Sequence, residues 1–179
     1  MNDPLFFMAL LPGPEIRAEV TAFKEYAARH FNTSRALTSP PHITVFPPFR
    51  WKTARYRDLV RVMELFAARE KAFWIELKHF NAFAPRVIYV DVAENADLQS
   101  LEKRLVATLK DQLNLEKEHA QPFHPHMTVA FKDLDKAVFS QAWDYFSGLN
   151  YQRMFQAGAL TLLHHENGKW HIDREIKWG

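Results

Sequence analysis

The chain has 179 residues, 47% of them hydrophobic, which predicts one folded domain with a substantial core and excludes a disordered chain. Its formal net charge at pH 7 is only +2, so extensive charge-driven binding to long nucleic acids is not expected. The absence of cysteine excludes disulfides, a thiol nucleophile and cysteine-based zinc sites.

The chain opens with a predicted strand and helix. Residues 5–11 form a continuous apolar run, typical of a strand covered on both faces. This run is too short for a membrane helix and lacks the basic start of a signal peptide, so we expect a cytoplasmic protein without a membrane partner. After Pro12-Gly13-Pro14, apolar residues at helical spacing predict a helix to about His30; they are Ile16, Val20, Phe23 and Ala27.

A second strand and helix follow a polar link. Pro40-Pro41 lead into an apolar run rich in β-branched residues, which predicts a strand that Pro47-Pro48 should end. Beyond it, Leu59, Met63 and Phe66 predict a helix from about Thr53 to Glu70.

The middle of the chain predicts a hairpin and a third helix. Apolar residues alternate over 73–77 and again over 88–92, and the bend between them contains Asn81 and Pro85. A helix should begin near residues 95–97, where Asn95 and Asp97 are both suitable caps, and its apolar stripe is Leu98, Leu101, Leu105 and Leu109.

The last third predicts one more strand, a helix and a hairpin. A polar connection ends at Pro122 and delivers a strand around residues 125–131. Asp135 can cap the next helix. Asn167-Gly168 predicts a tight turn between Leu160–Leu163 and a second arm, with Trp170, Ile172 and Ile176 expected on one face of that arm.

One pentapeptide is nearly repeated. Pro41-His42-Ile43-Thr44-Val45 returns as Pro125-His126-Met127-Thr128-Val129, with only Ile and Met exchanged. Because side chains alternate along a strand, each copy should present its histidine and threonine on one face and its apolar residues on the other. The repeat predicts two imidazoles and two hydroxyls that share a site.

This combination suits chemistry at a phosphate ester. Two imidazoles can act as acid and base near neutral pH, because the unperturbed pKa of histidine is about 6.5. The hydroxyls of Thr44 and Thr128 can donate hydrogen bonds to an anion between the imidazoles. A lone His-x-Thr would be weak evidence in a chain with 9 histidines, but a repeated pentapeptide is much harder to attribute to coincidence.

The two segments resemble the paired H-x-T-x motifs of the 2H phosphoesterase superfamily, and within it the 2′-5′ RNA ligase-like (LigT-like) proteins. The resemblance covers most of the chain in motif order and spacing. It implies an α+β, bilobal fold with two mixed or antiparallel sheets and flanking helices: one domain over 1–179, with two pseudo-symmetric lobes facing a cleft and one motif strand in each, around 41–47 and 125–131.

The resemblance also implies an activity. It predicts a metal-independent phosphoesterase, without a cofactor, that hydrolyses or reversibly ligates a 2′,3′-cyclic phosphate or a 2′-5′ phosphodiester. The expected partner is a nucleotide or RNA end, and no protein partner is evident. His42 and His126 would be catalytic, with His126 as base and His42 as acid or the reverse, and Thr44 and Thr128 would bind phosphate.

One position departs from the family pattern. Many LigT-like proteins carry an arginine three residues after the second motif's threonine, where it contacts the phosphate. This chain has Phe131 there, followed by Lys132. A binding module that keeps the site without the chemistry is therefore the alternative function.

Other residues have two interpretations. Phe46 shares the parity of His42, so it could stack on a substrate base or belong to the core. His124 could orient His126 or lie at the rim of the site. Arg50 and Lys132 could supply charge near a phosphate, although ordinary surface roles fit both. A metal site is a further alternative, because two groups of histidines occur: His119, His124 and His126, and His164, His165 and His171.

Overall fold

The computed structural model describes residues 2–179, which contain eight strands and four α-helices. The strands are β1 (Leu5–Leu10), β2 (Ile43–Arg50), β3 (Phe73–Phe83), β4 (Val87–Val92), β5 (His126–Ala130), β6 (Gln152–Ala157), β7 (Ala159–Glu166) and β8 (Lys169–Lys177). The helices are α1 (Pro14–Phe31), α2 (Tyr56–Ala67), α3 (Ala96–Leu113) and α4 (Phe139–Ser147), with short 3₁₀ helices at Arg35–Thr38 and Thr53–Arg55.

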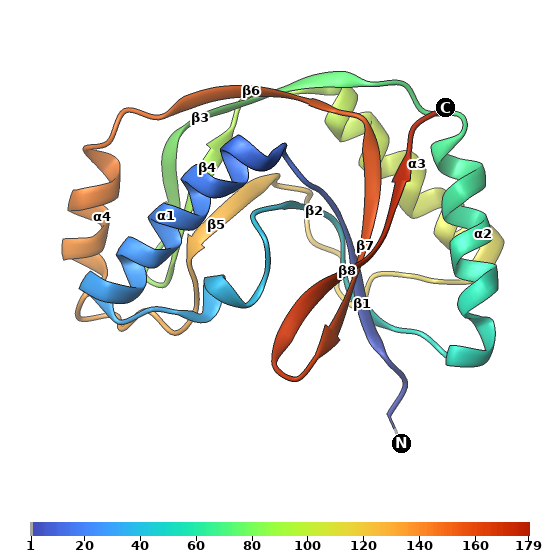
Figure 1. Cartoon of the computed structure of the whole chain (residues 1–179), viewed down its shortest axis with the longest axis horizontal. Helices are drawn as coiled ribbons and strands as arrows, with labels where there is room; N and C mark the ends of the chain where they lie inside the picture. Colours follow the sequence, from blue (N-terminus) through green and yellow to red (C-terminus); the bar gives the residue numbers. More distant parts are fainter. Residues whose placement is uncertain (1) are drawn as a thin grey trace.

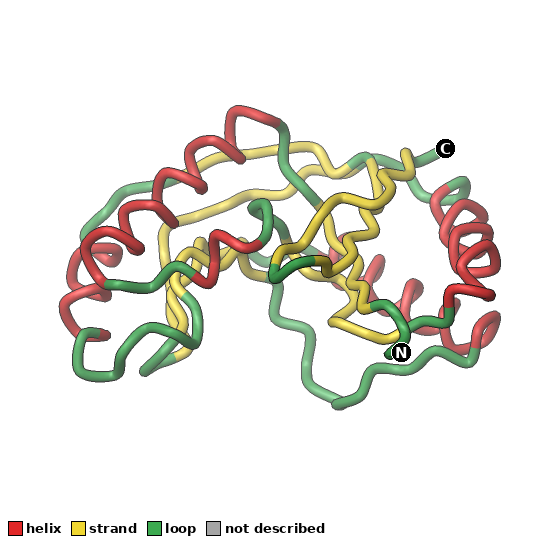
Figure 2. The backbone as a smooth tube through the Cα atoms, turned by 60° about the horizontal axis from the view of Figure 1, so that its bottom comes forward, coloured by secondary structure: helices red, strands yellow, loops and turns green. Residues whose placement is uncertain are grey.

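The strands form two four-stranded antiparallel sheets with the orders β2-β1-β7-β8 and β5-β4-β3-β6. Helices α2 and α3 lie at one end of the molecule and α1 and α4 at the other (Figure 1), with the strands between them (Figure 2). Helix α1, which follows β1 of the first sheet, contacts β5 of the second sheet. Helix α3, which follows β4 of the second sheet, contacts β2 of the first sheet. Each sheet therefore packs against a helix from the other half of the chain. The expected α+β fold is confirmed, with both sheets antiparallel.

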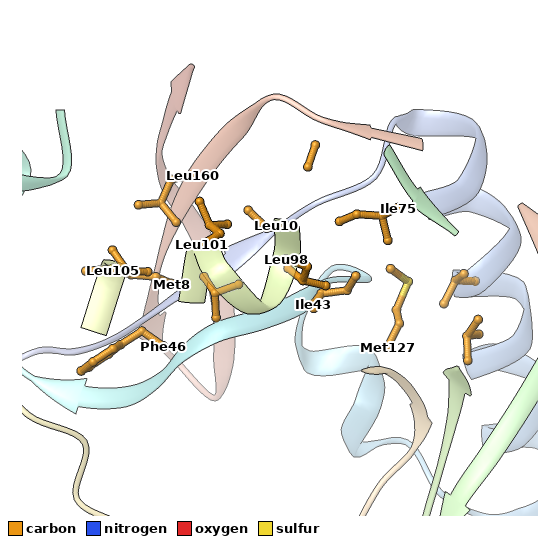
Figure 3. Packing of buried hydrophobic residues seen from close by; sticks show 14 of the residues in the cluster. Met8, Leu10, Ile43, Phe46, Ile75, Leu98, Leu101, Leu105, Met127 and Leu160 are labelled. Atoms are coloured by element: carbon orange, nitrogen blue, oxygen red, sulfur yellow. The ribbon is translucent and has the colours of Figure 1, made fainter. Parts of the chain in front are cut away.

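One hydrophobic core connects the two sheets. Figure 3 shows Leu10 and Ile43 of the first sheet, Ile75 and Met127 of the second, and Leu98 of α3 within it. The opening strand is covered on both faces, as its continuous apolar run predicts. Its even-numbered residues join this core, whereas Phe7 and Ala9 pack with Leu163 on the opposite face.

The helices and the last hairpin form largely where the sequence predicts them. The Asn95 side chain caps α3 by accepting a hydrogen bond from the Leu98 amide. Asn167 and Gly168 both have positive φ, of 51° and 76°, as the predicted tight turn requires. Helix α4 begins only at Phe139, because Asp135 caps a preceding turn through the Ala137 amide. Within residues 2–179, no helix has the length and apolar character needed to cross a bilayer.

The prediction that Pro47-Pro48 end the second strand is wrong. β2 continues through both prolines to Arg50. It is an edge strand of its sheet, so one side of its backbone has no neighbour in the sheet. The pairing also shifts between Met8–Phe46 and Phe6–Phe49, so the two prolines lie in a bulge, and edge strands and bulges are the places in a sheet that tolerate proline.

Phe46 does not face the site, so its proposed stacking on a base is wrong. Its side chain is fully buried in the core, 5.5 Å from the ring of Phe49 (Figure 3). The pairing register shifts here: Ala9 pairs with Thr44, but Met8 pairs with Phe46. A β-bulge of this kind inserts one residue and reverses the facing of those beyond it, which turns Phe46 inward.

Two further features of the last strands differ from the prediction. β6, which the sequence did not reveal, extends the second sheet by pairing with β3. On β8, a register shift lies between the pairs Leu162–Arg174 and Leu163–Ile172. Trp170 lies between the hairpin turn and this shift and shares the face of Phe7, which it contacts, whereas Ile176 lies beyond the shift and packs against the main core.

Candidate active site

The two repeated segments meet at one cavity. His42, Thr44, His126 and Thr128 all line a space of about 320 Å³, and β2 contacts β5 directly. The residues that alternate with these four along each segment point away from the cavity and are buried in the core; they are Ile43, Val45, Met127 and Val129. Strand alternation thus separates the polar face of each motif from its apolar face.

The two imidazoles are held in the same way. His42 Nδ1 lies 2.7 Å from the carbonyl oxygen of Pro40, and His126 Nδ1 lies 2.7 Å from that of His124. A carbonyl oxygen can only accept a hydrogen bond, so each Nδ1 must carry a proton. In the neutral ring Nε2 is therefore unprotonated and can act as a base, and a ring that has gained a proton at Nε2 can act as an acid.

His42 has an apolar setting that disfavours its charged form. Phe7 packs 4.8 Å from its ring, and Trp170 packs edge-on against Phe7 at 4.6 Å. Burial lowers the pKa of His42 to about 4, and the positive charge of Lys24 contributes to the shift. His42 is accordingly neutral at physiological pH.

This pKa predicts a pH dependence of stability. Between pH 6.5 and 4 the unfolded chain holds a proton on His42 that the folded protein does not, so stability should fall as the pH drops through this window. The contribution amounts to about 3 kcal/mol at full effect. Chemical denaturation of wild type and His42→Gln at pH 6.5 and pH 4 measures it. The variant should lose less stability than wild type, and an equal loss would contradict the assigned shift.

His126 lies in a more polar setting. Burial lowers its pKa as well, and so does the nearby His124 ring, whereas the hydrogen bond to the His124 carbonyl and the charge of Asp91, its cross-strand partner on β4, favour the charged form. The rings of Phe83 and Tyr89 each lie 5.1 Å away. His124 orients His126 through its backbone carbonyl, while its own exposed ring lies 3.2 Å from the Tyr89 hydroxyl, at the rim of the site.

A second groove of about 500 Å³ adjoins the cavity and shares Thr44, Pro48 and His126 with it. Phe83, Phe123 and His124 supply its aromatic surface. Lys132 also lines this groove, whereas Arg50 is exposed and donates to the Asp3 carbonyl oxygen. His126 therefore borders both spaces, whereas His42 lines only the first cavity.

The cavity is also lined by residues that the sequence did not single out for the site, among them Phe7, Lys24, Arg35 and Trp170. Lys24 had a recognisable signature, because it interrupts the apolar stripe of α1 between Val20 and Ala27 and is itself buried. Nothing in the local sequence marks Arg35 or Trp170 as part of the site, because their places depend on a loop conformation and on the pairing of β7 with β1 and β8. Phe131, at the position of the family's arginine, also lines this cavity.

The two histidine groups are the candidates for a metal site in this chain. Across residues 2–179, no group of three or more histidine, aspartate or glutamate side chains is arranged to hold a metal ion. His164 and His171 lie with their ring centres 5.5 Å apart on the outer hairpin, away from the motif cavity.

Comparisons with known proteins agree with this fold and identify relatives of the chain. The model of the 2′-5′ RNA ligase superfamily matches residues 12–169. A Bacillus pumilus protein named "Putative phosphoesterase" is 30% identical over 139 residues, which are 74% of this chain and 76% of that protein. A Geobacillus protein of the same description is 26% identical over 92% of this chain and 91% of its own length.

Solved structures share the fold across nearly the whole chain. TT0787 of Thermus thermophilus has a TM-score of 0.70 at 15% identity, with 97% of each chain covered. E. coli LigT in its apo form has a TM-score of 0.62 at 19% identity, with 99% of this chain and 96% of LigT covered. The match to the family model agrees with the antiparallel sheets and with the resemblance of the two repeated segments to the family's motifs. The chain belongs to the 2′-5′ RNA ligase superfamily.

Proposed function

We propose that this protein is a metal-independent phosphoesterase that opens a 2′,3′-cyclic phosphate, or cleaves a 2′-5′ phosphodiester, on a nucleotide or RNA end. The observation that carries the proposal is the pair of identically held imidazoles that line one cavity together with two threonines. Family membership supports phosphoesterase chemistry. E. coli LigT, which shares the fold, has been crystallised with 3′-AMP, ATP and phosphate.

The chemistry needs one base and one acid. Water attacks the phosphorus atom and gives a proton to Nε2 of one histidine, while the ribose oxygen leaves and takes a proton from Nε2 of the other. Thr44 and Thr128 donate hydrogen bonds to the non-bridging oxygens, on which negative charge accumulates. Proton exchange with solvent then restores both rings.

We assign His42 as the base and His126 as the acid in hydrolysis. At His42 the positive charge of Lys24 opposes protonation; at His126 the neighbouring His124 opposes it and the carboxylate of Asp91 favours it. The proton-poor ring suits a base and the ring beside a carboxylate suits an acid. This assignment is the reverse of the one that the family resemblance favours, and the roles exchange in the ligation direction.

A leaving group that needs no proton tests this assignment. A 4-nitrophenyl phosphodiester releases a stable phenolate, so an alanine at the acid position should retain far more activity on it than on a cyclic nucleotide. We expect His126→Ala to show this rescue and His42→Ala to fail on both substrates. Rescue of His42→Ala instead would reverse the assignment.

A substrate panel tests the function itself. Purified protein is given 2′,3′-cyclic nucleotides, cyclic-phosphate-ended RNA and 2′-5′ dinucleotides, with and without chelator. We expect chelator-insensitive turnover, and the product isomer identifies which ribose oxygen leaves. Saturable binding of one substrate without turnover would favour a binding module, and turnover that stops with chelator would contradict metal independence.

A further inference from the structure

Lys24 is a buried cation whose charge has little compensation within the protein. Its side chain is only 2% exposed, and Nζ donates one hydrogen bond, of 2.9 Å, to the Ser39 carbonyl oxygen. Among residues 2–179 no carboxylate forms an ion pair with it. An ammonium group has three donors, and burial of an unpaired charge is costly. The position therefore needs an anionic partner from outside the chain.

The cavity around Lys24 has the charge to attract such a partner. Lys24 and Arg35 are its two cationic residues, and its described lining contains no aspartate or glutamate. His42 adds no charge at neutral pH. The cavity thus combines two positive charges with the hydroxyls of Thr44 and Thr128, and this combination suits a phosphate group.

Arg35 is held at the mouth of the cavity by its backbone. Asp133, which follows β5, accepts hydrogen bonds from the Thr33 hydroxyl (2.7 Å), the Ser34 amide (2.9 Å) and the Arg35 amide (3.0 Å). The exposed guanidinium lies over the ring of Phe131 at 6.0 Å and has no ion pair among the described residues. Asp133 fixes the chain so that this charge remains available beside the cavity.

We propose that Lys24 and Arg35 are the phosphate-binding cations of this site, Lys24 from within the cavity and Arg35 from its mouth. The inference deepens the proposed function and rests on it for the identity of the anion as a phosphate ester. The two residues would supply the positive charge that position 131, a phenylalanine here, does not. Phe131 instead provides an apolar platform for the Arg35 guanidinium.

The protonation of Lys24 fits this role. Burial lowers its pKa to about 8, so it remains mostly charged at pH 7. A bound anion favours the charged form, and phosphate binding and protonation therefore reinforce one another. Phosphate affinity should consequently fall as the pH rises above 8.

The test measures binding without any need for turnover. Isothermal titration with inorganic phosphate at pH 7 compares wild type with Lys24→Met and Arg35→Gln. Their controls are Lys136→Met and Arg29→Gln, which remove the same charge from exposed positions. We expect Lys24→Met to bind phosphate about tenfold more weakly and Arg35→Gln about fivefold more weakly, with both controls within about twofold of wild type.

Folding is controlled separately. Lys24→Met removes a buried charge, so its thermal midpoint should rise while its phosphate affinity falls, a combination that a purely structural lysine would not give. Arg35 is exposed, so its variant reports on binding independently of folding. Wild-type affinity should also decrease between pH 7 and pH 9, and this decrease should be smaller in Lys24→Met.

The outcomes separate this proposal from the proposed reaction. Equal phosphate affinity in Lys24→Met and Lys136→Met, or in Arg35→Gln and Arg29→Gln, would overturn the assignment of that residue. Recovery of affinity on adding Phe131→Arg to Lys24→Met would support it, because position 131 lines the same cavity. If phosphate binding depends on both cations but the wild type turns over no phosphodiester, the binding site stands and the reaction does not.

Discussion

Replacing either His42 or His126 by alanine should lower turnover of a 2′,3′-cyclic nucleotide by about 10³-fold, because each imidazole performs one of the two proton transfers. The double variant should be little worse than either single one, since the two groups act in the same step. Initial rates at saturating and at limiting substrate measure kcat and kcat/KM separately. We expect the loss mainly in kcat.

The control for these variants is His171→Ala. His171 is exposed on the outer hairpin and lies outside the motif cavity, so its removal should leave turnover within about twofold of wild type. Thermal unfolding of all variants shows whether each remains folded. Full activity in both single motif variants would exclude two-histidine catalysis in this protein.

Phe46→Ala should lower the free energy of unfolding by about 3–5 kcal/mol, because it leaves a cavity where a fully buried ring packs against Phe49 and the core. If the protein remains folded, KM for a nucleotide substrate should change little. Chemical denaturation and steady-state kinetics measure the two effects. A large rise in KM with unchanged stability would restore Phe46 to the substrate site.

Phe83→Ala is the matched comparison. Its ring is 41% exposed, lines the groove beside His126 and packs against His124 and Tyr89. We expect a stability loss within about 1 kcal/mol, but a KM raised about tenfold if a base stacks in this groove. The two phenylalanines should thus show opposite patterns, and equal effects of both substitutions on KM would contradict this distinction.

The difference between these residues shows where strand periodicity stops being reliable. Alternation places His42 and Thr44 together correctly because both precede the β-bulge in β2. Phe46 follows the bulge, so the same rule gives the wrong face. Ile176 on β8 fails for the same reason, at the register shift between Ile172 and Arg174. A bulge depends on pairing with a distant strand, which local sequence does not specify.

Much of this protein could be predicted from sequence, because the features concerned are local. The repeated pentapeptide identified the two imidazoles and two hydroxyls, the apolar spacing located the main helices, and Asn95 and Asn167-Gly168 marked a helix start and a turn. Each depends on a residue and its near neighbours along the chain. The family resemblance rested on the same short segments.

Only the tertiary structure decided how the site is completed. The cavity of His42 and His126 is also lined by Lys24 on α1, Arg35 in the 3₁₀ helix and Trp170 on β8. Helix α1 packs against β5, Asp133 fixes the loop that carries Arg35, and β7 pairs with both β1 and β8, which brings Trp170 beside Phe7. These placements depend on contacts between residues far apart in sequence. The sequence by itself therefore marked the two histidines and two threonines that line one cavity, whereas long-range packing determined the charge and the aromatic walls around them.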